Sequence, residues 1–260
     1  MSIGIALVTG SAQGIGRAIS LRLADDGFDV AVNDIPSNQP ALDSLVDEIR
    51  AKGRQAVAVP ADVTQEEQVK EMVAKAVKDL GGLDVMVANA GICHSTGSVV
   101  ETTVENWDRH FDVNVKGVFF CYKHAGVQMV AQGRGGRIIG AASVSGKRGN
   151  SGFAPYSASK FAVRGLTQSL AQELGPHRIT VNTYAPGIID TPLMHNVEAA
   201  IAQKSGQELG ALAAGINAQT ALGYIGKPED IASLVSYIAS KEAHFITGQS
   251  VSANGGSHFD

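Results

Sequence analysis

Seven short apolar runs, rich in β-branched residues, alternate along the chain with longer amphipathic stretches, and this alternation constrains the fold more than any other feature. The runs show little of the polar alternation typical of a half-exposed strand, so each strand is expected to be buried on both faces. Strands of that kind, separated by helices, form a parallel sheet with helices on either side. The predicted strands are residues 5–9, 29–34, 55–61, 83–90, 136–142, 178–185 and 248–253. The sequence therefore predicts an α/β, doubly wound, seven-stranded parallel sheet.

A single domain over residues 1–260 is expected, because no linker, repeat or low-complexity segment separates the predicted elements. The stretches 107–132 and 157–174 predict two long helices. Residues 186–227 form the least regular part of the chain and are too long for an ordinary connection. Because long irregular segments in compact domains are usually functional, we expect a substrate-binding loop or lid there.

Charge and composition exclude several classes of function. The net charge of -4 argues against a nucleic-acid or anionic-membrane surface, and no run of 18 apolar residues could span a membrane. The first apolar run begins at Ile3, which leaves no room for a targeting presequence, so a cytoplasmic protein is expected. Cys93, Cys121 and the seven histidines lack metal-ligand spacing, and no metal site is predicted.

The stretch TGSAQGIG, residues 9–16, directly follows the first predicted strand and opens the first helix. Its glycines Gly10, Gly14 and Gly16 allow a tight turn and a close approach of backbone to ligand. The helix that follows presents unpaired N–H groups and the positive end of its dipole to a pyrophosphate. The strand–turn–helix context favours a dinucleotide site in a Rossmann fold, with the spacing G-x-x-x-G-x-G.

Asp34 ends the second predicted strand, where an acidic side chain can accept hydrogen bonds from the adenosine ribose and would repel a 2′-phosphate. The competing interpretation is a turn or cap residue before Pro36. Gln13 stands before Gly14, so no lysine or arginine at that position invites a phosphate. Together these residues favour NAD over NADP.

Further polar or turn-forming residues follow the third to sixth predicted strands. They are Asp62, the run Asn89-Ala90-Gly91, Ser143 and the pair Pro186-Gly187. Any one of them could be ordinary turn chemistry. Because ligands bind open α/β sheets outside the carboxyl ends of the strands, a shared ligand crevice explains the set better.

The stretch YSASK places Tyr156 and Lys160 four residues apart, which on a helix stacks the two side chains on one face. An ammonium near a phenol favours the phenolate, so the pair is expected to lower the pKa of Tyr156 for proton transfer. Taken alone, the pair is more often an aromatic residue at a helix start with a solvated lysine above it.

The motifs TGSAQGIG, NAG, FDVNVKG, AASVSG, YSASK, APGIIDTP and TGQSVSANGG, in this order, resemble the single-domain short-chain dehydrogenases/reductases over essentially the whole chain. The resemblance implies that Tyr156 is the catalytic acid/base and that Lys160 lowers its pKa and holds the nicotinamide ribose. It further implies that Ser143 holds the substrate oxygen and that Asn114 anchors a water in the proton relay.

The same resemblance implies which residues contact the cofactor. They are Gly10, Ser11, Gln13, Gly14, Ile15, Gly16, Asp34, Asp62, Val63, Asn89, Ala90, Gly91, Tyr156, Lys160, Pro186, Gly187, Ile189 and Thr191. The predicted substrate contacts are Ser143, Ser145, Tyr156, His94, Asn150 and Gly187. In this family the long helices commonly pair between subunits, so a homotetramer or homodimer is expected.

Within the family the chain is most similar to acetoin/diacetyl reductases (butanediol dehydrogenases), which implies a small hydroxyketone or diketone as substrate. Three alternatives stay open: a dehydrogenase of a bulkier secondary-metabolite alcohol or of a polyol or sugar, an NADP-dependent oxoacyl-carrier reductase, and a non-catalytic nucleotide-sensing protein. Asp34 and Gln13 count against the NADP enzyme, and the presence of Ser143, Tyr156 and Lys160 counts against the sensing protein.

Overall fold

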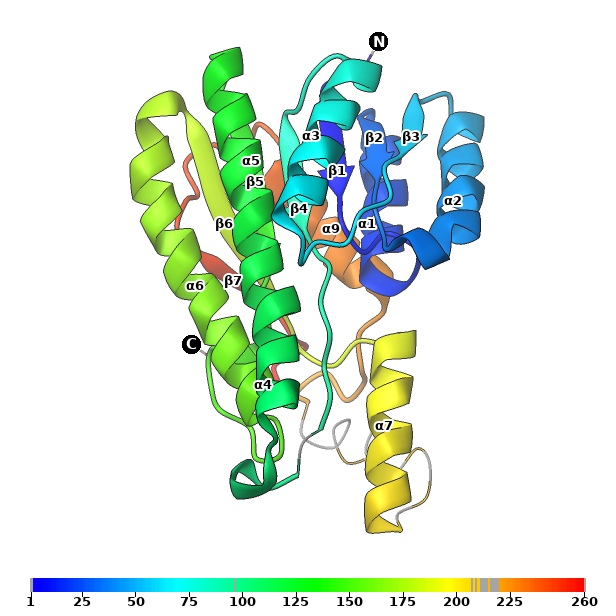
Figure 1. The fold of residues 1–260 in the computed structure, drawn as a ribbon, viewed down its shortest axis with the longest axis vertical. Helices are drawn as coiled ribbons and strands as arrows, with labels where there is room; N and C mark the ends of the chain where they lie inside the picture. The colour runs from blue at the N-terminus through cyan, green and yellow to red at the C-terminus, as the bar shows by residue number, and fades with distance from the viewer. Residues whose placement is uncertain are drawn as a thin grey trace.

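The computed structural model describes residues 2–95, 97–206, 208, 210, 215 and 220–259. Within these residues, seven strands form one sheet in the order β3-β2-β1-β4-β5-β6-β7 (Figure 1). All neighbouring strands run parallel. The strands are β1 (Ile5–Val8), β2 (Asp29–Val32), β3 (Ala56–Ala58), β4 (Val85–Ala88), β5 (Gly136–Ala141), β6 (Ile179–Pro186) and β7 (Ser250–Ala253). The doubly wound parallel sheet predicted from the sequence is confirmed.

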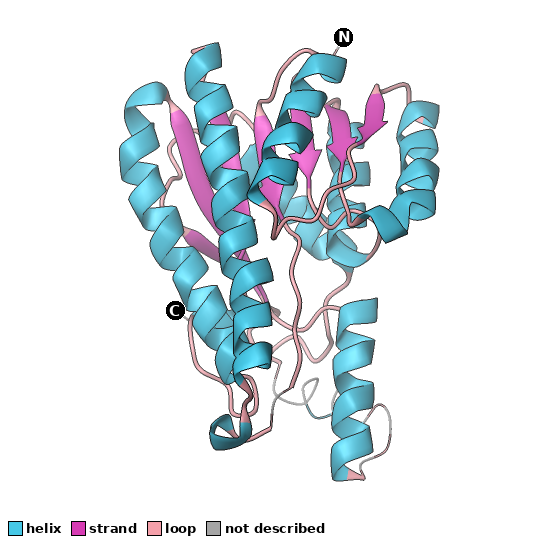
Figure 2. Ribbon diagram, in the orientation of Figure 1, coloured by secondary structure: helices cyan, strands magenta, loops and turns pink. Residues whose placement is uncertain are grey.

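Helices lie on both sides of the sheet (Figure 2). The buried side chains gather in two clusters, one under α1, α2 and α9 and the other under α3, α5 and α6. The helices are α1 (Gly14–Asp26), α2 (Gln39–Ala51), α3 (Glu66–Leu80), α4 (Val104–Phe111), α5 (Gly117–Gln132), α6 (Ala154–Leu174), α7 (Pro192–Ser205) and α9 (Pro228–Ala239). Two helical layers around one sheet account for the alternating pattern of the sequence.

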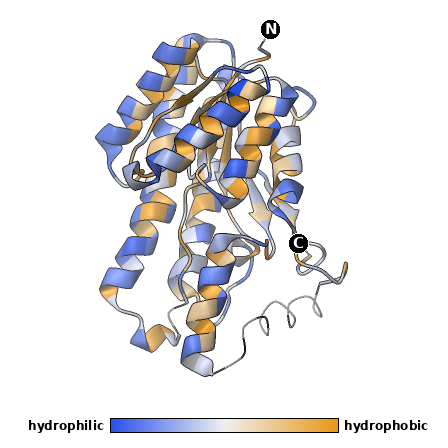
Figure 3. Cartoon of the chain, turned by 90° about the vertical axis from the view of Figure 1, so that its right-hand side faces the viewer, coloured by the Kyte–Doolittle hydropathy of each residue, from blue (hydrophilic) through white to orange (hydrophobic). Residues whose placement is uncertain are grey.

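Strand β1 shows why the strand runs lack polar alternation. Ala6 and Val8 pack into the cluster under α1 and α2, whereas Leu7 between them packs into the opposite cluster. Neither face of the strand meets water, and each large side chain buried in this way contributes about 1.5–3 kcal/mol. The helices instead carry both hydrophilic and hydrophobic surfaces (Figure 3).

The strand order reverses between β1 and β4. From β1 the chain builds β2 and β3 toward one edge, then returns to place β4 on the other side of β1. Loops that follow two such strands turn in opposite directions, and they leave a crevice at the carboxyl edge of the sheet. The glycine-rich turn after β1 and the Asn89-Ala90-Gly91 run after β4 therefore face each other.

The helix expected over 107–132 is interrupted. Helix α4 ends at Phe111, a π-helical turn spans Asp112–Lys116, and α5 begins at Gly117. A π-helical turn inserts an extra residue into the hydrogen-bonding pattern and often marks a functional position. This turn contains Asn114, which the sequence analysis assigned to the proton relay.

The segment 186–227 is more regular than expected. Residues 192–205 form α7, which stands apart from the sheet (Figure 1). The hydroxyl of Thr191 caps this helix by accepting a hydrogen bond from the Met194 N–H, and a proline at the first helical position suits the helix start. Residues 207, 209, 211–214 and 216–219 of the expected lid lie outside the described residues.

No helix among the described residues is long and apolar enough to cross a membrane. Over the same part of the chain, no group of three or more His, Cys, Asp or Glu side chains is placed to hold a metal ion.

Candidate active site

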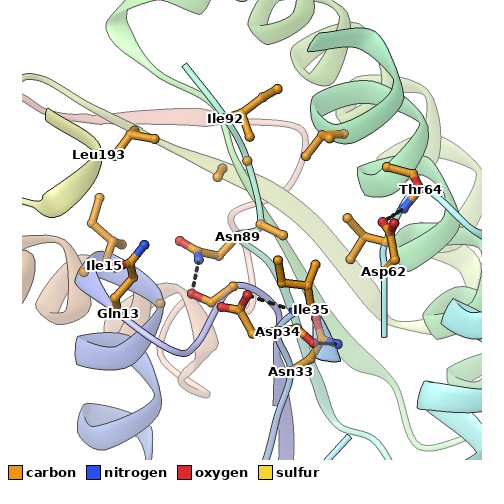
Figure 4. A pocket seen from close by; sticks show the side chains of 18 of the residues that line it. Gln13, Ile15, Asn33, Asp34, Ile35, Asp62, Thr64, Asn89, Ile92 and Leu193 are labelled. Carbon is orange, nitrogen blue, oxygen red and sulfur yellow. Dashed lines mark hydrogen bonds between the residues drawn. The ribbon is translucent and has the colours of Figure 1, made fainter. Parts of the chain in front are cut away.

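A cavity of about 850 Å³ opens at the carboxyl edge of the sheet, over the point where the strand order reverses (Figure 4). Fifteen of the residues predicted to contact a cofactor line it. They are Gly10, Gln13, Gly14, Ile15, Gly16, Asp34, Asp62, Val63, Asn89, Ala90, Gly91, Tyr156, Lys160, Pro186 and Thr191. The fold therefore brings together segments that are far apart in the sequence.

The glycine-rich turn forms one wall of the cavity. Gly10 and Gly14 have φ values of +67° and +55°, a region that favours glycine. A side chain at Gly16 would collide with the Gly10 carbonyl and the Asn89 side chain. Gln13 at the start of α1 makes no side-chain cap, so the first N–H groups of the helix stay available to an anionic ligand.

Asp34 lies at the end of β2 with its carboxylate held by three donors. One oxygen accepts a hydrogen bond from the Ala12 N–H at 3.0 Å. The other accepts from the Ile35 N–H and from Nδ2 of Asn38, both at 2.9 Å. The carboxylate is thus oriented before any ligand binds, and Asn38, which also lines the cavity, is a contributor that the sequence analysis missed.

Asn89 connects the three strands beneath the cavity. Its Nδ2 donates to the carbonyl oxygens of Thr9 and Gly10 at 2.8 and 3.2 Å, and its Oδ1 accepts from the Tyr184 hydroxyl at 2.7 Å. The side chain therefore fixes the glycine-rich turn against β4 and β6. Asp62 lies on the adjacent wall, where its carboxylate accepts a hydrogen bond from the Thr64 N–H at 2.9 Å (Figure 4).

The four predicted catalytic residues come from three separate segments. Tyr156 and Lys160 lie near the start of α6, Ser143 follows β5, and Asn114 lies in the π-helical turn. The Ser143 hydroxyl lies close enough to the Tyr156 phenol to lower the pKa of that phenol. Nζ of Lys160 lies 5.5 Å from the centroid of the Tyr156 ring and donates to the Ala141 carbonyl at 2.9 Å. The structure thus brings the serine, tyrosine and lysine into one cluster.

Burial controls the protonation of this cluster. It raises the pKa of Tyr156 above the ordinary value of a phenol, against a smaller lowering by the hydrogen bond with Ser143. Burial also lowers the pKa of Lys160 to about 8. The expected lowering of the Tyr156 pKa is therefore wrong for the protein alone, because desolvation of the buried phenol outweighs the groups that lower its pKa, and Lys160 is not among those groups.

The Asn114 side chain holds the backbone of Ile92, in the segment that follows β4. Its Oδ1 accepts from the Ile92 N–H and its Nδ2 donates to the Ile92 carbonyl, both at 2.9 Å. The same Nδ2 donates to Oγ of Ser159 at 3.1 Å. Asn114 is fully buried and does not line the cavity, so it joins the segment after β4 to helix α6.

The predicted substrate contacts next to Ser143 form a hydrogen-bonded series. Nδ2 of Asn150 donates to Oγ of Ser145 at 2.8 Å, and the Ser145 N–H donates to Oγ of Ser143 at 3.1 Å. His94 lies on the opposite segment, where its ring meets that of His110 edge-on at 5.6 Å. None of these four residues lines the large cavity.

Eight of the predicted site residues lie outside the wall of the cavity. They are Ser143, Ser145, His94, Asn150, Asn114, Gly187, Ile189 and Ser11. Ser11 is fully buried and its hydroxyl donates to the Val8 carbonyl at 2.6 Å. Ile189 is buried and pairs with Gly226, while the Gly187 N–H donates to the Ala253 carbonyl.

Sequence reasoning missed several residues that line the cavity. They are Asn33, Ile35, Asn38, Ala61, Thr64, Ile92, Glu105, Asp108, Arg109, Asp112, Val113, Ala141, Ala142, Tyr184 and Pro192. Most are neighbours of predicted contacts along the chain, and that adjacency is a signal that could have found them. The four charged residues of α4 and the π-helical turn had no such signal, because only the packing of α4 places them at the cavity.

Comparison with known proteins identifies the class to which this fold and cluster belong. Residues 4–202 match the family model described as short chain dehydrogenase, and the chain is a member of that family of oxidoreductases. A short-chain dehydrogenase/reductase of Armillaria gallica is 54% identical over 256 residues, covering 98% of this chain and 96% of the relative.

Relatives with more specific names share less of the sequence. An L-2,3-butanediol dehydrogenase of Corynebacterium glutamicum is 41% identical over 252 residues, covering 97% of each chain. A 3-oxoacyl-[acyl-carrier-protein] reductase of Staphylococcus aureus is also 41% identical, covering 96% of each. The crystal structure of an acetoin dehydrogenase from Salmonella typhimurium superposes with a TM-score of 0.85 at 32% identity, covering 99% of this chain and 97% of the other.

The cluster leads to a prediction for Tyr156. Tyr156→Phe removes the only proton that the phenol can exchange and keeps the ring, so turnover is expected to fall by about 10²–10⁴-fold with the fold intact. Steady-state kinetics with a carbonyl substrate, together with the fluorescence of bound reduced cofactor, separates loss of chemistry from loss of binding. Tyr237→Phe, an exposed position on α9, is the matched control. A Tyr156→Phe variant with a near wild-type kcat would contradict the assignment.

Proposed function

We propose that the protein is an NAD-dependent oxidoreductase that interconverts a secondary alcohol and a ketone, with a small hydroxyketone or diketone such as acetoin or diacetyl as substrate. The observation that carries the proposal is the cluster that Ser143 and Lys160 form with Tyr156 beside the glycine-rich turn, with Nζ of Lys160 5.5 Å from the centroid of the Tyr156 ring. Membership of a dehydrogenase family establishes the class of reaction.

The glycine-rich turn fits a dinucleotide. At Gly16, the Gly10 carbonyl and the Asn89 side chain take up the space that a side chain would fill. Glycine at this position therefore allows the turn to pack closely against Asn89, with its backbone lining the cavity. The uncapped N–H groups at the start of α1 suit the pyrophosphate. When bound, the nicotinamide cofactor supplies or accepts the hydride, and its oxidised form adds a positive charge to the site.

The protein's own residues would move the proton. With its pKa raised by burial, the Tyr156 phenol keeps its proton at neutral pH and can donate it to a carbonyl oxygen during reduction. The Ser143 hydroxyl, which stabilises the phenolate through its hydrogen bond, would also hold the substrate oxygen as negative charge develops there. Lys160 is held against the Ala141 carbonyl, where it can bind a ribose hydroxyl.

Asp34 supports NAD as the cofactor. Its carboxylate is presented to the cavity by three hydrogen-bond donors, as a ribose hydroxyl requires, and it would repel a 2′-phosphate. Among the described residues of the cavity wall, the only cations are Lys160 and Arg109. Arg17, on the first turn of α1, is instead paired with Glu48 at 2.6 Å. An NADP enzyme would need a cation near Asp34.

The hydrogen-bonded series of Ser143, Ser145 and Asn150 supports a substrate with a second oxygen. Ser145 and Asn150 bring a hydroxyl and an amide close to the serine that would hold the reacting oxygen. The relatives named for butanediol and acetoin agree with this inference. The similarity to an oxoacyl-carrier reductase favours a second candidate, the reduction of a 3-oxoacyl thioester.

A panel of carbonyl substrates tests the proposal. We expect diacetyl and acetoin to give the highest kcat/KM with NADH, followed through the absorbance of the reduced cofactor. A preference for acetoacetyl thioesters with NADPH would favour the oxoacyl reductase, and a preference for bulky terpenoid ketones or for sugars would favour the other dehydrogenases. If no carbonyl reacts while NADH still binds, the protein is a nucleotide-sensing protein.

Replacement of Asp34 tests the cofactor preference separately. Asp34→Ser should lower the ratio of kcat/KM for NADH to that for NADPH by about 10- to 100-fold, because a hydrogen bond to a charged group contributes about 1.5–3 kcal/mol. Asp43→Asn on α2, which removes the same charge outside the cavity wall, should leave the ratio unchanged. Equal use of both cofactors by the wild type would refute the role of Asp34.

The outer surfaces of α5 and α6 support assembly. Phe119, Val127 and Phe161 are 39%, 65% and 43% exposed on these two helices, so we infer that they pair with a second subunit in a homotetramer or homodimer. Light scattering should give a mass of two or four times 27.0 kDa, and Phe161→Glu should lower it. Ile3→Glu, at an exposed position near the first strand, is the control, and a monomeric wild type would contradict the inference.

A further inference from the structure

His110 is a fully buried residue near the end of α4, and both nitrogens of its ring are occupied. Nδ1 lies 2.8 Å from the Asn106 carbonyl oxygen, to which it can only donate. Nε2 lies 3.3 Å from the His94 backbone nitrogen, whose N–H donates to it. The two contacts together require the neutral ring with its proton on Nδ1.

Among the described residues, three contacts with four hydrogen bonds in all hold residues 92–95, the segment that follows the Asn89-Ala90-Gly91 run, and the bond donated by His94 is one of these contacts. Asn114 holds the backbone of Ile92 by two hydrogen bonds of 2.9 Å at one end. The Ser95 hydroxyl donates to the Gly152 carbonyl at 3.4 Å at the other end. His110 provides the contact in the middle, and it is the only one of the three that a proton can break.

The segment 92–95 borders the reacting groups. Ile92 lines the large cavity. The Cys93 thiol is partly buried and interacts electrostatically with both the Tyr156 phenol and the Lys160 ammonium. A shift of this segment would therefore change the wall of the site on the side of Tyr156, without a change in the glycine-rich turn or in Asp34.

We propose that His110 is a positioning residue whose neutral ring holds the segment 92–95 against the active site, so that substrate binding weakens when the ring takes up a proton. The proposal rests on the function proposed above, in that Tyr156 marks the position of the substrate. A protonated ring would carry N–H groups at both nitrogens, and the Nε2–H would then face the His94 N–H.

The surroundings of His110 oppose its protonation. Three titratable groups face the ring: His94 on the segment it holds, Arg109 on its own helix and Lys160 on α6, and each disfavours a further positive charge. Together with burial they lower the pKa of His110 below its ordinary value, against a raising effect of the Asn106 carbonyl. The contact is therefore complete at neutral pH and is lost as the pH falls below the ordinary histidine range.

Two variants separate the loss of the hydrogen bond between the His94 N–H and His110 from the loss of a ring that can be protonated. His110→Leu removes the acceptor, whereas His110→Gln offers an amide oxygen that can accept from the His94 N–H and does not titrate. His244→Ala is the matched control, because it removes an exposed imidazole outside the site. The readouts are hydrogen–deuterium exchange of the amides of residues 92–95, and the pH dependence of KM and kcat with the carbonyl substrate that the panel identifies.

In His110→Leu we expect faster exchange at His94 than in the wild type, unchanged exchange in the sheet, and a KM for the carbonyl raised about tenfold at neutral pH, with the affinity for NADH preserved. In the wild type and in His244→Ala, KM should rise on the acid side of neutrality. In His110→Gln that rise should be absent, with a KM near the wild-type value.

The proposal is overturned if exchange at His94 is the same in His110→Leu as in the wild type, if the acid rise in KM persists in His110→Gln, or if the wild type and His244→Ala show no such rise. Exchange needs no turnover. A wild-type protein without activity on any carbonyl would therefore remove the proposed function, while the exchange data would still decide whether His110 holds the segment.

Discussion

The reversal of strand order between β1 and β4 is the constraint on which the rest of the site depends. Only at that reversal do the loops after two neighbouring strands part, so that a dinucleotide can lie across the edge of the sheet. Asn89 fixes the two loops where they separate. Its side chain donates to the Thr9 and Gly10 carbonyls and accepts a hydrogen bond from the Tyr184 hydroxyl. The glycine-rich turn, Asp34 and the cluster around Tyr156 take their positions from this arrangement.

Burial of the Tyr156 phenol favours one direction of the proposed reaction and opposes the other. The desolvation that raises the pKa of Tyr156 keeps its phenol protonated, which suits the reduction of a carbonyl, whereas oxidation of an alcohol requires the phenolate. The hydrogen bond with Ser143 and the positive charge of an oxidised nicotinamide both act against desolvation. The balance between these effects would adjust the proton affinity of one phenol to the redox state of the bound cofactor.

The sequence predicted the fold and about half of the residues that line the cavity because both leave local signals. Strands buried on two faces lack polar alternation, and Gly10, Gly14 and Gly16 mark a turn that no other residue fits as well. The helix α7 and the π-helical turn at Asn114 were not predicted, since their patterns are irregular and the packing of neighbouring elements decides them. Asn38 and the charged residues of α4 that line the cavity were not predicted for the same reason.

The sequence by itself determined the doubly wound sheet and the family, and it singled out Ser143, Tyr156 and Lys160 as the candidate catalytic residues. Periodicity and motif spacing are properties of the chain. Only the tertiary structure decided the proton affinity of Tyr156, the orientation of the Asp34 carboxylate and the contact of His110 with the His94 backbone. Each of these depends on which groups from distant segments meet in a buried place. Desolvation and hydrogen-bond geometry exist only once the chain has folded.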